Sequence, residues 1–264
     1  MGMLSFTFLG NNFILVSASI PHPLDDGRPA LILYNLDQHE EETHAHLLRF
    51  LFPTPYPAHG HSAILLTSDP SSSWSSSPGL QVPFQIPCDE RIIALNLHRF
   101  YRGDAHSETL LVPASNLLCH VGDIPVGGEG RDIEWESWGP PCIERVPYQG
   151  GWSVYTCFLF GMRHILPTAA RRGDRRVMIV RDLCQRRRTR ASEDEREESN
   201  ALHQAMGCEE PYPRSIVKCV PLPKSIRDSS NVHLMIGEDG IVALEVRHEK
   251  ACVFMAARLM LLGY

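Results

Sequence analysis

The sequence has no long apolar run, no closely spaced pair of cysteines and no excess of positive charge. No stretch approaches the ~20 consecutive apolar residues of a membrane-spanning helix, so no membrane partner is expected. The eight cysteines are scattered, several of them inside apolar runs, which favours free buried thiols in a reducing compartment. The first 16 residues have no basic leader, so no secretory signal is expected. These absences predict a cytoplasmic or nuclear protein.

The net charge of −6 provides no overall attraction to nucleic acid, although one segment is strongly basic. Residues 171–190 contain nine arginines, and an acidic block follows at 193–198. Adjacent basic and acidic blocks are typical of a solvated excursion, so we expect a disordered loop at about 186–200. Alternatively, the arginines at 186–188 could direct the chain to the nucleus or contact a phosphate backbone. The acidic block partly neutralises them, so a nucleic-acid partner is not expected.

The motifs of common enzyme classes are also missing. There is no Gly-x-Ser-x-Gly elbow, no phosphate-binding Gly-x-x-x-x-Gly-Lys loop and no dinucleotide fingerprint after a strand. The pairs His44/His46 and His59/His61 could each present two zinc ligands on one strand face. Neither pair has a further ligand at a recognisable spacing, which favours surface histidines. We therefore assign no catalytic, cofactor-binding or metal-binding residue and expect that the chain is not an enzyme.

The sequence does contain a polar or glycine turn followed by an apolar run, and this pattern occurs four times. The copies begin at Gly10, Cys88, Gly161 and Gly237, which are 78, 73 and 76 positions apart. A near-constant period indicates a repeat architecture, in which each unit buries its apolar face against its neighbours. The alternative is chance similarity between ordinary buried strands, and the third copy departs from the others at Pro167.

A second apolar run follows each copy after a variable polar turn. These second runs lie at 30–36, 109–112, 176–180 and 251–255. Two short β-favouring runs joined by a polar loop predict a hairpin. Because the runs are continuous rather than alternating, they are typical of strands buried on both faces. Only residues 202–206 have helical character.

Three tryptophans are candidate partner-binding residues. Trp135 and Trp138 lie three positions apart beside a proline turn, and Trp74 lies in the serine-rich loop 71–78. Exposed tryptophan beside charged residues is the composition of a protein-binding hot spot. For the 135/138 pair, the pattern favours the other interpretation, in which Trp135 packs between sheets and the turn covers the end of the unit.

Several segments together resemble one known protein family. They are 6–36 followed by 68–70 and 78–84, then 111–118 and 135–140, and finally 220–224 leading to 237–240. This set, spread over nearly the whole chain, is similar to the C-terminal region of the expanded F-box protein family of mushroom-forming (basidiomycete) fungi. The resemblance implies a divergent, propeller-like β-domain that recruits substrate, downstream of a helical F-box that docks the Skp adaptor of a cullin-type ubiquitin ligase.

The chain departs from that family pattern at its beginning. It has no Leu-Pro-x-Glu opening and no helical apolar segment near residue 1. Skp and cullin are therefore expected as partners only if a missing N-terminal F-box exists. The resemblance supplies no binding residues, because the matching segments have no known catalytic or ligand-binding motif.

We predict an all-β, β-propeller-like chain with four WD-like repeat units of 73–78 residues. The units span approximately 4–78, 79–150, 151–230 and 231–264 in one domain over 1–264. Propellers typically have 4–8 four-stranded blades, so four units form a partial ring or, alternatively, a small closed ring. The expected function is a protein-interaction module for an unidentified protein partner, without cofactors. It resembles the substrate-recruiting region of an F-box ubiquitin-ligase receptor without its own adaptor-binding motif. The alternative is a propeller-type hydrolase or another enzyme with a central pocket.

Overall fold

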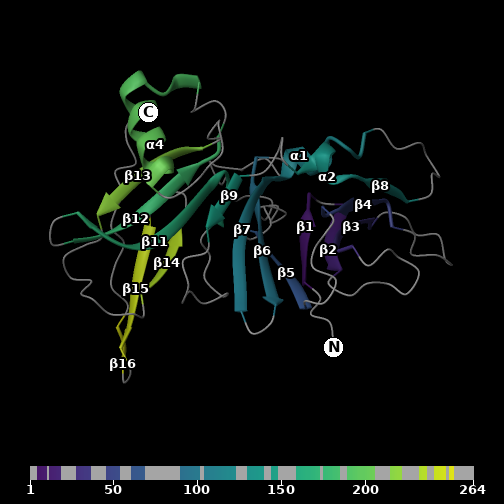
Figure 1. The fold of residues 1–264 in the computed structure, drawn as a ribbon, viewed down its shortest axis with the longest axis horizontal. Coiled ribbons are helices and arrows are strands. Elements are labelled where there is room, and N and C mark those ends of the chain that lie inside the picture. Colours follow the sequence, from purple (N-terminus) through teal and green to yellow (C-terminus); the bar gives the residue numbers. More distant parts are fainter. Residues whose placement is uncertain are drawn as a thin grey trace, which may run out of the picture. The chain divides into compact units, whose positions relative to one another are not determined.

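The computed structural model describes residues 5–10, 12–18, 28–36, 46–53, 61–68, 90–101, 104–122, 130–139, 144–147, 159–172, 175–184, 189–205, 215–221, 232–236, 241–247 and 250–252. Most of these residues lie in four β-sheets (Figure 1). The expected all-β class is confirmed. The chain divides into two compact units, unit 1 (1–148) and unit 2 (149–264). The expected single domain of four repeat units stays a prediction. None of the helices in the described ranges has the length and apolar character to cross a membrane.

Unit 1 begins with sheet A, a meander of consecutive antiparallel strands. These are β1 (Ser5–Leu9), β2 (Phe13–Ala18), β3 (Ala30–Asn35) and β4 (Leu48–Leu51). Gly10 in the β1–β2 turn has φ of 73°, a left-handed conformation that favours glycine. A fifth strand, β8 (Arg131–Ile133), pairs with β4 in parallel, so a segment much later in the chain covers that edge of the sheet.

Sheet B completes unit 1. Its antiparallel strands lie in the order β5 (His61–Ser68), β6 (Ile92–Tyr101), β7 (Asp104–Pro113) and β9 (Glu144–Pro147). The connection between β7 and β9 contains α1 (Ala114–Leu118), then β8, then α2 (Trp135–Trp138). The β7–β9 connection of sheet B therefore reaches the edge of sheet A, where β8 pairs with β4. The chain then returns to sheet B as its fourth strand, β9.

Sheets A and B share one hydrophobic core. Side chains alternate across a strand, so the register β2–β3–β4 places Leu15, Leu33 and Leu48 on one face of sheet A. This face packs in the same buried cluster as Ile93 and Leu95 of sheet B. Further members of the cluster are Leu9, Leu31, Phe50, Phe52, Ile64, Leu66, Leu97, Leu110, Val112, Leu117, Trp135 and Trp138.

Unit 2 contains two further antiparallel sheets. Sheet C has the order β10 (Leu159–Phe160), β11 (Arg163–Arg172), β12 (Arg175–Asp182) and β13 (Ile216–Pro221). Sheet D comprises β14 (Val232–Ile236), β15 (Ile241–Arg247) and β16 (Lys250–Cys252). The β11–β12 register shifts between Pro167 and Arg171, which is where the third sequence copy departs from the others. Because proline has no N–H, it cannot complete the ladder at that point.

The four recurring runs form the second strands of four different sheets. They become β2, β6, β11 and β15, and the second runs pair with them as β3, β7, β12 and β16, which confirms the predicted hairpins. Three sheets also share one closing hydrogen bond, from the amide after the third strand to the carbonyl before the second. The pairs are Leu36 N to Asn12 O at 2.7 Å, Ala114 N to Arg91 O at 2.8 Å, and Leu183 N to Met162 O at 2.8 Å.

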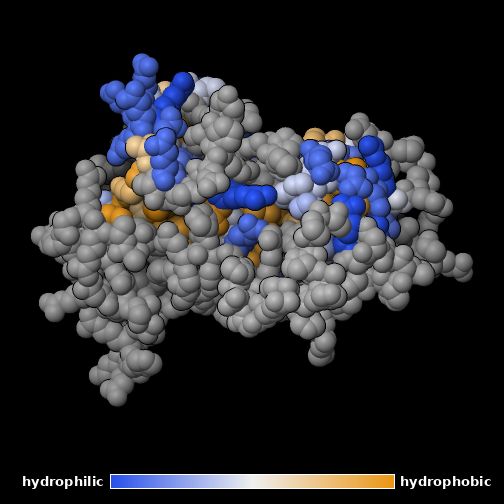
Figure 2. All heavy atoms as spheres, viewed as in Figure 1, coloured by the Kyte–Doolittle hydropathy of each residue, from blue (hydrophilic) through white to orange (hydrophobic). Residues whose placement is uncertain are grey.

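The expected disordered loop at 186–200 is wrong for its acidic part, because residues 193–200 belong to helix α4 (Glu193–Ala205). Ser192 and Glu195 form a reciprocal capping box, with Glu195 N–H donating to Ser192 Oγ and Ser192 N–H to Glu195 Oε2, both at 3.2 Å. Acidic residues in the first turn also complement the helix dipole. The helix packs on β13 and presents a largely hydrophilic outer surface (Figure 2). Residues 185–188 lie outside the described ranges.

Candidate functional site

Residues 130–139, which we call the docking segment, attach the β7–β9 connection to sheet A. The segment begins where Arg131 N–H donates to Leu47 O at 3.3 Å and continues as β8 beside β4. Gly130 is required at this entry, because a Cβ atom there would overlap His46. Close backbone approach is a common reason for glycine at such a position.

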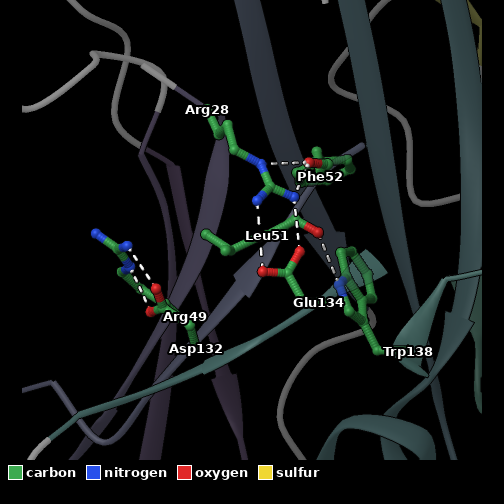
Figure 3. Close-up of polar contacts among 7 residues, drawn as sticks. All are labelled: Arg28, Arg49, Leu51, Phe52, Asp132, Glu134 and Trp138. Atoms are coloured by element: carbon green, nitrogen blue, oxygen red, sulfur yellow. Dashed lines mark hydrogen bonds and ion pairs between the residues drawn. The ribbon is translucent and has the colours of Figure 1, made fainter. Parts of the chain in front are cut away.

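Two arginine–carboxylate pairs hold the docking segment (Figure 3). Arg49 binds Asp132 in a bidentate manner, with Nε–Oδ1 and Nη2–Oδ2 both at 2.8 Å. Arg28 binds Glu134 at 2.8 and 3.5 Å and also donates from Nε and Nη2 to Phe52 O at 3.3 and 3.2 Å. The carboxylates are 44% and 55% exposed, so each pair contributes only about 0.2–1 kcal/mol. Because all four carboxylate oxygens are engaged by arginine, the cluster fits a structural clamp better than an acid–base pair.

An aromatic cluster of Trp135, Trp138, Phe50 and Phe52 adjoins these two ion pairs at Phe52, whose carbonyl oxygen accepts from Arg28. The ring centroid of Trp138 is 5.0 Å from Trp135, 5.2 Å from Phe52 and 5.6 Å from Phe50. Its indole Nε1–H donates to Leu51 O at 3.0 Å, so the polar atom of this buried side chain is satisfied. Gly139 follows at the helix end, where a Cβ atom would overlap the Trp135 ring.

The structure places the three candidate tryptophans as follows. Trp135 is 6% exposed and Trp138 is 0% exposed, so both belong to the core of unit 1. The packing alternative accounts for them, and the proposed partner contact through either indole is not supported. Trp74 lies outside the described residues.

The histidine pairs do not come together with further metal ligands in the described part of the chain. No group of three or more His, Cys, Asp or Glu side chains with metal-binding geometry occurs there. His46 lies beside Gly130 and His61 begins β5, whereas His44 and His59 lie outside the described residues.

The second face of sheet A is largely apolar, and no second sheet among the described residues of unit 1 covers it. We call it the open face; by register it carries Phe6, Phe8, Ile14, Val16, Ile32 and Tyr34. Phe6 is 60% exposed and Phe8 is 42% exposed, and their rings meet edge to face at 6.0 Å. Leu36, at 43%, continues the same alternation. These three are the exposed large hydrophobic side chains among the described residues, and sequence reasoning missed them. The sequence contains no signal for this exposure, because apolar residues on a strand form the same pattern whether or not a second sheet covers them.

In unit 2, α4 and β13 meet through a serine–histidine network. His203 Nδ1–H donates to Ser199 O at 2.9 Å, and Nε2 lies 3.5 Å from Ser215 Oγ. Ser199 Oγ accepts the Val217 N–H at 2.9 Å. A serine hydroxyl beside an oriented histidine is the geometry of an activated nucleophile. However, Ser215 is 2% exposed and His203 is 6% exposed, so burial closes this pair to a substrate.

A second buried histidine lies in sheet C. His164 on β11 is directly opposite Arg181 on β12, and these side chains are 4% and 0% exposed. Burial, followed by the charge of Arg181, lowers the pKa of His164 to about 3. His164 is therefore neutral at physiological pH and packs as part of the interior. On the other face of the same strand pair, Arg163 Nε lies 3.6 Å from Asp182 Oδ2.

Comparison with known proteins provides no independent identification. The chain matches no protein-family profile, no curated protein and no solved structure. The resemblance to the F-box family therefore stays a prediction, and a functional assignment depends on the geometry of the chain itself.

Proposed function

We propose that this chain is a protein-interaction module on a propeller-like scaffold, resembling the substrate-recruiting region of an F-box ubiquitin-ligase receptor. The observation that carries the proposal is the repeated sheet plan. The same pair of apolar runs forms the second and third strands of each of the four sheets, and three sheets share the same closing hydrogen bond.

This plan agrees with the blades of a propeller. Propeller blades are four-stranded sheets repeated around a central axis. Sheets B and C each have four antiparallel strands, sheet A has four plus β8, and sheet D has three among the described residues. Sheets A and B also pack face to face through one core, as neighbouring blades do. Such scaffolds present loops and strand edges from several repeats to a protein partner.

The polar clusters of the described residues favour binding over catalysis. In unit 1 the carboxylates of Asp132 and Glu134 are engaged by arginine. In unit 2 the Ser215–His203 pair is buried and supports the α4–β13 contact. Both arrangements fit a stabilising role in the scaffold better than a catalytic role.

Affinity capture of the tagged chain, followed by mass spectrometry, tests the proposal. Recovery of Skp and cullin with a further stoichiometric protein supports the ligase role, and recovery of a stoichiometric protein alone supports an interaction module outside a ligase. A parallel capture uses Trp138→Ala, which destabilises unit 1. Proteins that this variant retains equally well are binding unfolded chain or unit 2. Failure to recover any protein that depends on a folded unit 1 or unit 2 contradicts the proposal.

The alternative function, a propeller-type hydrolase, would use the Ser215–His203 pair. A fluorophosphonate probe reports it directly, because the probe labels an activated serine hydroxyl that solvent can reach. Burial predicts that Ser215 is not labelled in the folded chain. Labelling that is lost in both Ser215→Ala and His203→Ala would favour the hydrolase, whereas unaltered background labelling would not.

A further inference from the structure

We propose that the arginine end of the β11–β12 hairpin, residues 171–172 and 175–176, binds the phosphate backbone of duplex DNA. We call these residues the arginine ribbon. The inference goes beyond the proposed function and does not depend on it. It begins from the register of the two strands, in which Arg171 is directly opposite Arg176 and Arg172 is directly opposite Arg175. In sequence, the two residues that join these strands add one carboxylate, that of Asp174. The hairpin end therefore concentrates positive charge.

Two directly opposed arginine pairs are unfavourable in an isolated hairpin, because like charges opposite one another destabilise an antiparallel pair. The β11–β12 register shifts between Pro167 and Arg171, yet the pairing resumes at Arg171 rather than ending at the irregularity. Bulges in a strand are common next to functional sites, where they bend the strand and redirect its residues. A bound polyanion accounts for this arrangement, because arginine–phosphate hydrogen bonds offset the repulsion between the arginines.

The arginine ribbon extends beyond the strand pairs that flank the hairpin in sheet C. Among the described residues, β13 pairs with β12 only as far as Val177, which is directly opposite Pro221. On the other side, β10 pairs with β11 only at 163–164. The part that carries the arginines is therefore a two-stranded ribbon. The major groove of B-DNA is about 12 Å wide and admits a ribbon of this kind.

Arginines occur on both faces of the ribbon. Because residues alternate along a strand, Arg171 and Arg176 belong to one face, and Arg172 and Arg175 belong to the other. An acidic protein surface would meet only one face, whereas a DNA groove has phosphates along both of its walls. The planar guanidinium of arginine also matches phosphate in a bidentate manner. These properties favour duplex DNA over an acidic protein segment.

The acidic block at 193–198 is anchored away from the arginine ribbon. Glu195 binds Lys218 at 2.7 Å, and Lys218 is directly opposite Val180 on β12. Arg176 lies further along β12, at a distance of about 13 Å for a rise of about 3.3 Å per residue. This distance exceeds the Debye length of about 8 Å at physiological salt. From Glu195, α4 continues toward the opposite end of β13.

The expectation of no nucleic-acid partner depended on the acidic block and on the net charge. By register, the acidic block does not neutralise the arginine ribbon. The net charge of −6 still weakens the long-range attraction to DNA, so we expect binding that is weak, independent of base sequence and confined to the ribbon.

Fluorescence anisotropy of the full chain with a labelled, mixed-sequence DNA duplex of about 20 base pairs tests the inference at about 50–200 mM salt. We expect a Kd in the micromolar range at the lowest salt and a linear decrease of log K with log salt. Four phosphate contacts predict a slope of about −3.6, because each contributes about −0.9. Arg171→Gln/Arg176→Gln removes two contacts, so the slope should change to about −1.8 and the affinity should fall about tenfold or more.

Two further double variants separate the ribbon from net charge. Arg131→Gln/Arg190→Gln is the matched control, because it removes the same charge from exposed arginines outside the ribbon, and it should retain the wild-type slope. Arg171→Lys/Arg176→Lys keeps the charge and should also retain the slope. The melting temperature of Arg171→Gln/Arg176→Gln should not fall, because the substitution removes a like-charge pair.

Four outcomes overturn the proposal. They are a wild-type chain that leaves the anisotropy unchanged up to about 100 μM protein, a wild-type slope weaker than about −1, a ribbon variant with the wild-type slope, and a matched control that loses as much affinity as the ribbon variant. Labelled polyglutamate, titrated in the same way, tests the other occupant. Tighter binding of polyglutamate than of the duplex, lost in Arg171→Gln/Arg176→Gln, would identify an acidic protein segment and refute DNA.

Discussion

Trp138→Ala is the most direct test of how unit 1 is held together. Trp138 is 0% exposed, and its ring lies within 5.6 Å, centroid to centroid, of Trp135, Phe52 and Phe50. Its Nε1–H also donates to Leu51 O. The substitution therefore removes the centre of the aromatic cluster and one of the hydrogen bonds between the docking segment and β4.

The expected cost is large relative to the stability of a domain. Truncation of a buried phenylalanine or tryptophan to alanine costs about 3–5 kcal/mol. Loss of the indole donor adds about 1 kcal/mol or more, because the Leu51 carbonyl is then partly unsatisfied in a buried place. Since a typical domain unfolds with a free energy of about 5–15 kcal/mol, we expect unit 1 to lose about a third of its stability or more. At roughly 2–4 °C per kcal/mol, a total cost of about 4–6 kcal/mol should lower the melting temperature by about 8–24 °C.

Urea unfolding followed by far-UV circular dichroism measures the change in free energy, and hydrogen exchange locates it in unit 1. Ser137→Ala, at an exposed position on the same helix, is the matched control and should change the unfolding free energy by less than about 0.5 kcal/mol. Trp138→Phe keeps a ring but removes the donor, so it should fall between the two. The reasoning is refuted if Trp138→Ala unfolds at the same urea concentration as Ser137→Ala. That result would mean that the indole is not packed, and partner contact would again be the better explanation.

Three further substitutions test other parts of the fold. Burial and Arg181 lower the pKa of His164 to about 3, so below about pH 6.5 the unfolded chain binds a proton that the folded chain does not. Unit 2 should therefore lose stability as the pH falls from 6.5 to 3. His164→Leu should reduce this pH dependence, measured as the urea midpoint of unfolding across the same range. A slope equal to wild type would show that His164 is solvated. Gly139→Ala forces a methyl group into the Trp135 ring and should cost about 1–3 kcal/mol by thermal unfolding, whereas an unchanged melting temperature would contradict this packing. Ser199→Ala removes the hydroxyl that accepts the Val217 N–H between α4 and β13, and it should lower the unfolding free energy by about 1–3 kcal/mol. Amide hydrogen exchange in β13 should become faster, and unchanged exchange would argue against that contact.

Most of the strand plan could be predicted because it depends on local order in the chain. The turn-and-run pattern at Gly10, Cys88, Gly161 and Gly237 predicts the second strands, and the following runs predict their neighbours. Hairpin pairing joins segments that are close in sequence, so apolar runs and polar turns are sufficient to indicate it. The acidic part of 186–200 was misjudged because the prediction used charge composition alone and did not consider the capping box that Ser192 and Glu195 form.

The surface and the role of the tryptophans could not be predicted in the same way. In sequence, Trp135 and Trp138 allow both packing and partner contact, with packing favoured, and their 6% and 0% exposure agrees with packing. The parallel pairing of β8 with β4 joins residues about 80 positions apart, which no local pattern specifies. No motif reveals that Phe6 and Phe8 stay exposed, because an apolar strand has the same sequence pattern whether or not a second sheet covers it.

The sequence by itself therefore determined the all-β class, the four recurring strand pairs and the lack of recognisable catalytic motifs, because each of these follows from short-range patterns of apolar, polar and glycine residues. Only the tertiary structure decided which face of sheet A is buried, which aromatic residues form the core and which remain at the surface. Those properties depend on how sheets stack, and sheet stacking brings together residues from distant parts of the chain.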